Sequence, residues 1–245
     1  MAEGRGRLWQ IALAGNTLVL LLGVLLLAQG DLLFGPPMVK PGEGPPLPPG
    51  SRAERVLLVV MDALRDDTAA RTGLMPHLNA LAKRGGRGHT QVGALVPATV
   101  AAVQVLASGR VPPPAVFLED FGASTAEHGG IFQVLKQAGR ESFAAGIHLW
   151  HDLYGPWLAG WETVETLHHD DPRVLAAGIR ALQDPRYQLV VIHFARADEA
   201  AHRFGPRTAA YAGAAAWHDL YGPWLAGWET VETLHHDDPR VLAAG

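Results

Sequence analysis

An acidic side chain and an imidazole lie four residues apart, shortly after an apolar segment. Tyr187–Phe194 reads YQLVVIHF and is followed by ARADEAAHRFGP, which places Asp198 and His202 at positions i and i+4. On a helix this spacing puts both side chains on one face, where they can bind the same metal ion. Many solvated helix faces carry such a pair without a function. The strand before it and the Phe-Gly-Pro break after it favour a pair of metal ligands here.

A second acid follows an earlier apolar segment. Val56–Met61 reads VLLVVM, an unbroken apolar run that is typical of a strand buried on both faces of a parallel sheet. Asp62 comes next, at the carboxyl edge of that strand, where open α/β sheets bind ligands. Two interpretations of Asp62 remain open at this point, a functional carboxylate and a cap of the following helix.

A hydroxyl stands at the start of a small, apolar helix between the two strands. Val100–Ala107 predicts a buried helix that ends near Gly109, and Thr99 immediately precedes it. The commonest function of threonine at this place is to cap the helix. The alternative is a nucleophile, because the positive end of a helix dipole favours an alkoxide and an incoming phosphate. A metal ion would still be needed to lower the pKa of the hydroxyl.

Bulk composition narrows the class of protein. The chain has 245 residues and is 48% hydrophobic, which is enough for a large α/β domain. Its net charge of −4 gives no basic surface, so nucleic acid is not an expected partner. There are no cysteines, which excludes disulfides, thiolate-bound zinc and a cysteine nucleophile. We therefore expect an α/β domain with a mixed, mostly parallel central sheet flanked by helices.

The N-terminus has the features of a membrane anchor. Leu8–Ala28 contains no charged residue, and its 21 residues match the ~20 that a helix needs to span a bilayer. Arg5 and Arg7 precede it, which predicts a cytoplasmic N-terminus and a domain outside the cytoplasm. A cleaved signal peptide, giving a secreted domain, is the alternative. We expect residues 1–30 to form the cytoplasmic tip and anchor, and 31–53 to form a Pro/Gly-rich linker.

Several motifs in this order resemble the alkaline phosphatase superfamily, over about residues 54–211. The similarity is strongest to type I phosphodiesterases/nucleotide pyrophosphatases and to GPI ethanolamine phosphate transferases. The most specific stretch is VVIHFARADEAAHRFGP, because this family has His, then Asp, then His-x-x-Gly-Pro. The other matching stretches are VVMDALRDD, MPHLNALAKRG, PATVAAVQVLASGR and GIHLW.

The resemblance implies roles for the candidate residues. Asp62 and Thr99 would hold one divalent metal ion, with Thr99 as the nucleophile that becomes phosphorylated, and Asp198 and His202 would hold the second. Oxygen and imidazole ligands suit zinc, with manganese as the other option. The substrate would be a phosphodiester or a phosphomonoester, cleaved by hydrolysis or transferred to an alcohol. Sulfatases share part of the pattern, but the Cys/Ser-x-Pro-x-Arg motif of their nucleophile is absent after Asp62.

The sequence departs from the family pattern in two respects. The family also needs an Asp-His-Gly after a further strand and one more histidine, and no Asp-His-Gly occurs in this sequence. Expected ligands of both ions are therefore missing, so we expect a fragment that is inactive or very weak by itself. The alternative from another class is a non-catalytic, anchored domain. Arg65 and His193 also match the family pattern, but the sequence assigns them no chemistry.

An exact repeat replaces the expected second half. All 29 residues of Trp150–Gly178 recur as Trp217–Gly245. Repeat proteins stack several diverged units, so two identical copies favour a recent duplication or a sequence error. We expect residues 54–216 to form a partial domain and 217–245 to be artefactual or disordered. In that case the second copy contributes no strand at the place where the family needs one. Trp217, Trp224 and Trp228 have no evident face to pack against, so we expect this tail either to be poorly ordered or to lie over an exposed edge of the sheet.

Overall fold

The computed structural model describes part of the chain, including a first helix at 15–25 and most of the predicted domain. The described residues are 15–25, 53–89, 98–112, 116, 123, 125, 126, 128–164, 170–219 and 231–232. In these segments no helix is both long enough and apolar enough to cross a membrane. The remainder of the predicted anchor, and nearly all of the predicted linker, lie outside the described residues.

A parallel sheet forms the centre of the described domain. Its strand order is β3-β2-β4-β1-β5, and every neighbouring pair is parallel. The strands are β1 (Val56–Met61), β2 (Glu141–Ile147), β3 (Gly160–Val164), β4 (Tyr187–Phe194) and β5 (Val231–Glu232). The two apolar segments predicted as strands are β1 and β4, and they lie side by side. The expected α/β class with a mostly parallel sheet and flanking helices is confirmed.

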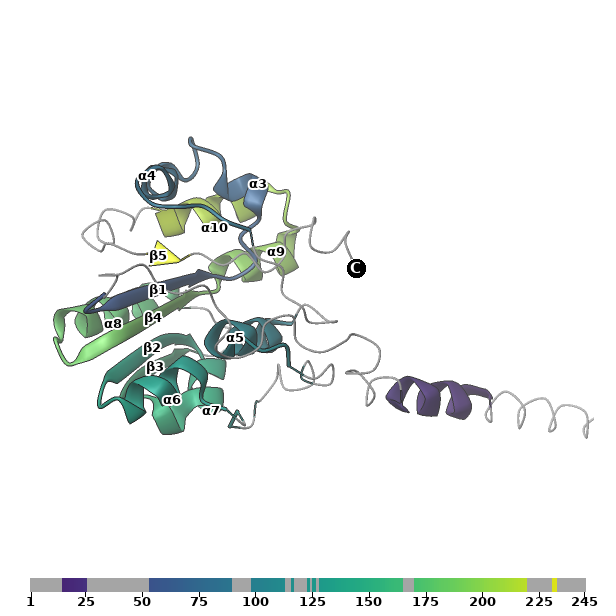
Figure 1. Cartoon of the computed structure of the whole chain (residues 1–245). Helices are drawn as coiled ribbons and strands as arrows, with labels where there is room; N and C mark the ends of the chain where they lie inside the picture. The colour runs from purple at the N-terminus through teal and green to yellow at the C-terminus, as the bar shows by residue number, and fades with distance from the viewer. Residues whose placement is uncertain are drawn as a thin grey trace, which may run out of the picture.

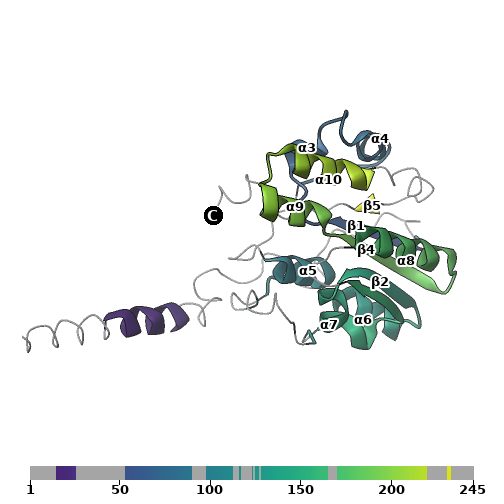
Figure 2. The same cartoon turned by 180° about the vertical axis from the view of Figure 1, so that it is seen from behind.

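Helices cover both faces of the sheet, which explains why β1 is continuously apolar (Figures 1 and 2). α8 packs on one face, whereas α5, α6 and α7 lie over the other. α10 contacts α3 and α4 on the β1 side of the sheet. The helices are α3 (Asp66–Ala69), α4 (Pro76–Arg84), α5 (Thr99–Ser108), α6 (Gly130–Gln137), α7 (Leu149–Tyr154), α8 (Asp171–Gln183), α9 (Arg196–Phe204) and α10 (Ala209–Asp219), with a 3₁₀ turn at Gly155–Trp157.

Alternation along the strands divides the core into two clusters. Successive side chains of a strand point to opposite faces, so β1 sends Val59 and Met61 toward α8 and Val60 toward α5. In β4, Ile192 and Phe194 join the α8 side. The position of a residue along a strand therefore determines the face of the sheet on which its side chain lies. This also holds for a polar residue within the strand or directly after it.

The structure describes one short strand in the second copy of the repeat. Val231–Glu232 forms β5, which pairs with Leu57 and Leu58 of β1 at an edge of the sheet. This pairing agrees with the alternative that the second copy lies over an exposed edge of the sheet. The corresponding Val164 of the first copy ends β3, at the opposite edge of the sheet. A parallel sheet leaves backbone donors and acceptors unpaired at each edge, and a further extended segment can satisfy them.

Trp217 also has a partner face, contrary to the sequence-based expectation. Its ring meets that of Phe194 at 6.2 Å edge to face, and the guanidinium of Arg196 lies 5.1 Å from its centre. Asp219 accepts hydrogen bonds from the backbone N–H groups of His77 and Leu78, which caps the exposed first turn of α4. The first residues of the second copy are thus part of the packed domain. Trp224 and Trp228 lie outside the described residues.

Candidate functional site

Asp62 and His193 meet because of strand alternation and register. Val60 pairs with His193, and the Asp62 N–H donates to the Phe194 carbonyl at 2.8 Å, which extends the ladder by one residue. Asp62 has the parity of Val60, so it faces the α5 side of the sheet. His193 is 1% exposed, and its Nε2 lies 3.5 Å from Asp62 Oδ2. The carboxyl edge of β1 therefore carries a carboxylate with an imidazole beside it.

Thr99 completes this contact from the first turn of α5. Its hydroxyl donates to Asp62 Oδ2 at 3.1 Å, and the residue is half-buried. The cap position of α5 is Ala98, which has no side chain able to bond, so Thr99 is not the cap of this helix. Nor does Asp62 cap the next helix, since Arg65 occupies that position before α3. The structural alternatives to a functional role do not describe either residue.

The turn after Asp62 is held in place from a distant part of the chain. Ala63 has a φ of 53°, an unfavourable left-handed conformation for a residue with a Cβ. The Tyr211 hydroxyl donates to the Ala63 carbonyl at 2.7 Å and accepts from the Arg65 N–H at 2.8 Å. Burial raises the pKa of Tyr211, which keeps this hydroxyl protonated and able to donate. α10 thereby fixes the backbone that orients Asp62.

Asp198 and His202 form the predicted pair on α9. His202 Nε2 lies 3.3 Å from Asp198 Oδ1, and the imidazole is 79% exposed. α5 and α9 lie at the same end of the sheet in both views (Figures 1 and 2). The structure thus gives one contact between Asp62 and Thr99, and another between Asp198 and His202.

The donors suit a metal by type but are few in number. Carboxylate, hydroxyl and imidazole are ligands that zinc and manganese accept. The described residues nevertheless contain no group of three or more His, Asp or Glu side chains placed to hold a metal ion. Each predicted ion therefore has two candidate ligands among the described residues.

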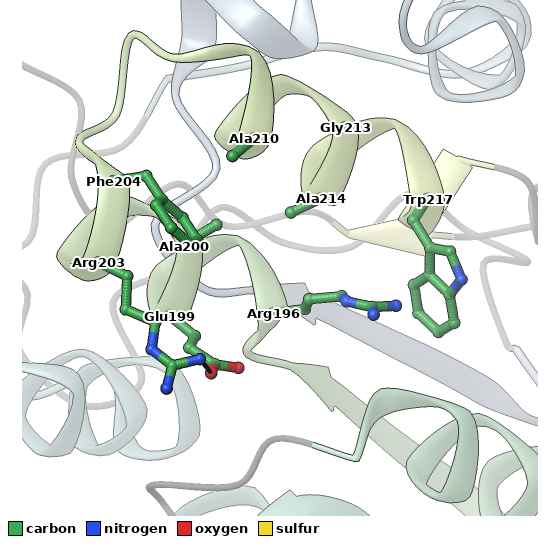
Figure 3. Close-up of a pocket in the computed structure, with 9 residues that line it drawn as sticks. All are labelled: Arg196, Glu199, Ala200, Arg203, Phe204, Ala210, Gly213, Ala214 and Trp217. Atoms are coloured by element: carbon green, nitrogen blue, oxygen red, sulfur yellow. Dashed lines mark hydrogen bonds and ion pairs between the residues drawn. The ribbon is translucent and has the colours of Figure 1, made fainter.

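A hollow of about 450 Å³ lies between α9 and α10, away from these ligands (Figure 3). Arg196, Glu199 and Arg203 line it from successive turns of α9, with Trp217 at one end. Residues three and four apart share a face of a helix, so Arg196, Glu199 and Arg203 line the hollow together. The hollow contains none of the predicted ligands or the predicted nucleophile.

A buried contact between an aspartate and a histidine, which the sequence did not predict, supports the start of α9. Asp171 accepts from the Ala195 and Arg196 N–H groups at 3.1 and 3.0 Å, and from His218 Nε2 at 2.7 Å. Asp171 and His218 are each 1% exposed. Burial by itself raises the pKa of Asp171, but the bonds from His218, Ala195 and Arg196 outweigh it and hold the pKa below its usual range. The pair joins the two copies of the repeat, so spacing within either copy could not reveal it.

Comparison with solved structures identifies the fold of this chain. No family model and no curated protein matches this sequence. Among solved structures, the domain resembles murine ectonucleotide pyrophosphatase/phosphodiesterase 5, an inactive form in complex with AMP, with a TM-score of 0.59 and 18% identity. The chain adopts the alkaline phosphatase fold. The match covers 74% of this chain and 55% of the murine chain.

A second solved structure with the alkaline phosphatase fold gives the same picture. Phosphonoacetate hydrolase from Sinorhizobium meliloti 1021, in complex with phosphonoformate, matches with a TM-score of 0.54 and 18% identity. This match covers 74% of the present chain and 55% of the hydrolase chain. The chain thus spans about half the length of the solved structures it resembles. At such identities the likeness establishes the alkaline phosphatase fold alone.

Proposed function

We propose that this chain belongs to a membrane-anchored, metal-dependent phosphoester hydrolase or transferase that reacts through Thr99. The observation that carries this proposal is the hydrogen bond from Thr99 Oγ1 to Asp62 Oδ2, at the carboxyl edge of β1. The hydroxyl lies in the first turn of α5, where the helix dipole favours an anionic phosphoryl group. The alkaline phosphatase fold, shared with a phosphodiesterase and a phosphonate hydrolase, supports the same class of reaction.

Thr99 would act as the nucleophile toward phosphorus. Its Oγ1 forms a bond to the phosphorus atom as the bond to the leaving oxygen breaks, and the departing alcohol takes a proton. The hydroxyl proton of Thr99 leaves in the same step, and Asp62 Oδ2 is the acceptor nearest to it in the structure. Attack by water or by a second alcohol on the Thr99 ester then gives hydrolysis or transfer. Two divalent ions, held by Asp62 with Thr99 and by Asp198 with His202, would supply charge neutralisation at phosphorus.

Membrane attachment is proposed from the first helix and the segment around it. The described helix at 15–25 exposes its apolar side chains, with Leu18, Leu20 and Leu21 each more than 60% accessible. Such exposure on a soluble helix is costly, whereas in a bilayer it is the stable arrangement. Arg5 and Arg7 before this segment support a cytoplasmic N-terminus. The domain would then lie outside the cytoplasm, anchored by residues 8–28 or secreted after their removal.

Metal dependence gives the first prediction. We expect the whole protein to purify with two zinc or manganese ions per chain, and a chelator to abolish turnover until the ion is restored. His202→Ala removes one candidate ligand, so the metal content measured by mass spectrometry should fall by about one ion per chain. His151→Ala is the control, because His151 is half-exposed and belongs to neither predicted pair. Unchanged metal content in His202→Ala would remove this residue from the ligand set.

A non-catalytic anchored domain is the second candidate function. The sequence leaves this alternative open, because it offers two candidate ligands for each of the two expected ions. The same measurement separates the two functions, because a binding domain should purify without metal and keep its thermal stability in chelator. Chelator-sensitive turnover of a phosphodiester would exclude this alternative.

A further inference from the structure

His193 packs within the sheet beside a glycine of the neighbouring strand. It lies in β4, is 1% exposed, and takes no part in the proposed bond changes. Gly146 of β2 lies against it, and a Cβ at that position would come within 2.7 Å of His193 Cβ and 2.9 Å of its carbonyl oxygen. Gly146 also has a φ of 153°, which disfavours any other residue. β2 therefore has a residue without a side chain at the place where His193 packs.

Trp150 determines which nitrogen of His193 carries the proton. The indole Nε1 lies 2.9 Å from His193 Nδ1 in a buried hydrogen bond. An indole N–H can only donate, so Nδ1 must accept, and the neutral imidazole must carry its proton on Nε2. The rings cross at 80° with their centres 6.0 Å apart, which fixes the plane of the imidazole as well.

The protonated nitrogen then faces the carboxylate that receives the Thr99 hydroxyl. His193 Nε2 has no hydrogen-bond partner in the described part of the chain, and Asp62 Oδ2 lies 3.5 Å away. That separation is longer than a direct hydrogen bond, but catalytic contacts are often long in a ligand-free site and tighten when the reacting groups bind. The same oxygen, Oδ2, accepts from Thr99 at 3.1 Å.

We propose that Trp150 and His193 are positioning residues, which hold Asp62 Oδ2 in place for Thr99 through the chain Trp150–His193–Asp62. This inference rests on the proposed function, because it assigns the chain a purpose only if Thr99 reacts. The indole sets the imidazole tautomer, the imidazole N–H orients the carboxylate, and the carboxylate orients the hydroxyl. Second-sphere donors of this kind align ligating and reacting groups, and their loss typically costs about 10- to 100-fold in activity or metal affinity.

The repeat supplies a matched pair of variants. Trp150→Phe removes the indole N–H and keeps an aromatic ring beside Phe132 and Tyr154. Trp217→Phe makes the same change at the same position of the second copy, within an identical sequence from that residue onward. Trp217 packs against Phe194, on the opposite face of the sheet from Trp150. Both variants lose an indole, but only Trp150→Phe loses the bond to His193.

The first measurement is independent of activity. Long-range proton–nitrogen NMR spectra of the whole protein report which imidazole nitrogen is protonated, and His193→Gln identifies the His193 signals. The proposed hydrogen-bond chain predicts a proton on Nε2 of His193 in the wild type and in Trp217→Phe. It predicts a shift toward the Nδ1-protonated form in Trp150→Phe. A wild-type His193 protonated on Nδ1, or spectra unchanged in Trp150→Phe, would overturn the proposal.

Kinetics of the same proteins test the purpose of the chain. Trp150→Phe should lower kcat about tenfold with little change in KM, whereas Trp217→Phe should leave both within about twofold. His193→Gln can present an N–H toward Asp62 and should retain more activity than His193→Leu. Equal losses of kcat in the two tryptophan variants, or in His193→Gln and His193→Leu, would show that these residues act through packing alone. Failure of the proposed function would instead show as wild-type protein without metal-dependent turnover, whatever the NMR result.

Discussion

Replacing Thr99 with alanine is expected to lower the kcat of the whole protein by about 10⁴-fold or more. The variant removes the atom that would form the bond to phosphorus, together with its hydrogen bond to Asp62. Loss of a nucleophile in other enzymes has effects of this size, because the remaining binding groups supply only a residual rate. Steady-state hydrolysis of a chromogenic phosphodiester measures the change.

Thr99→Ser is the matched control for this prediction. Serine keeps the hydroxyl in the first turn of α5 and within reach of Asp62, so turnover should stay within about tenfold of the wild type. Both variants should retain the wild-type melting temperature within a few degrees, because the side chain is only half-buried. A Thr99→Ala protein that turns over at the wild-type rate would contradict the nucleophile assignment directly.

Replacing Asp171 with alanine should destabilise the domain more than any change at its surface. The variant leaves His218 buried without its partner and leaves the Ala195 and Arg196 N–H groups without an acceptor. Breaking a buried pair in this way costs roughly 3–5 kcal/mol. For a domain of this size that is a fall of about 10 °C in melting temperature, measured by circular dichroism or calorimetry.

The first copy of the repeat again provides the control. His151 is the counterpart of His218, but its side chain is 41% exposed and lies 3.7 Å from Asp152. His151→Ala should therefore cost less than about 1 kcal/mol, whereas His218→Ala should approach the loss in Asp171→Ala. Equal effects of the two histidine variants would show that the second copy is not packed as described here.

The Asp171 contribution should also depend on pH. Because the folded pKa of Asp171 is lowered, its stabilisation is fully present above the unfolded pKa of about 3.9 and is lost as the pH falls through the folded value. The melting-temperature gap between the wild type and Asp171→Asn should thus be constant near neutral pH and close below about pH 4. A melting-temperature difference that widens as the pH falls would mean that folding raises the pKa of Asp171 instead of lowering it.

The sequence was sufficient for the elements with the simplest physical requirement. A parallel strand covered on both faces must be largely apolar, and Val56–Met61 and Tyr187–Phe194 meet that requirement at β1 and β4. The acid that follows β1 lies at the carboxyl edge because chain direction places it there. Alternation could also have flagged His193, since it has the parity of the face on which Asp62 lies.

Tertiary context determined what the sequence could not. Trp150, His151 and Asp152 lie in α7, whereas the identical Trp-His-Asp of the second copy ends α10. One sequence thus meets two environments, so local propensity cannot have chosen between them. The contacts that matter most, from Trp150 to His193 and from Tyr211 to Ala63, join segments 43 and 148 residues apart. Only the folded sheet brings such segments together.

The most direct test of the account is to trap the reaction on Thr99. The whole protein would be incubated with a phosphoester and zinc, quenched in acid at short times, digested and sequenced by tandem mass spectrometry. If Thr99 is the nucleophile, a phosphoryl group, or a phosphoryl group that keeps one alcohol of a diester substrate, is esterified to Thr99 and absent from Thr99→Ala. Rapid turnover with Thr99 unmodified at every time, or with the group on another residue, would contradict it.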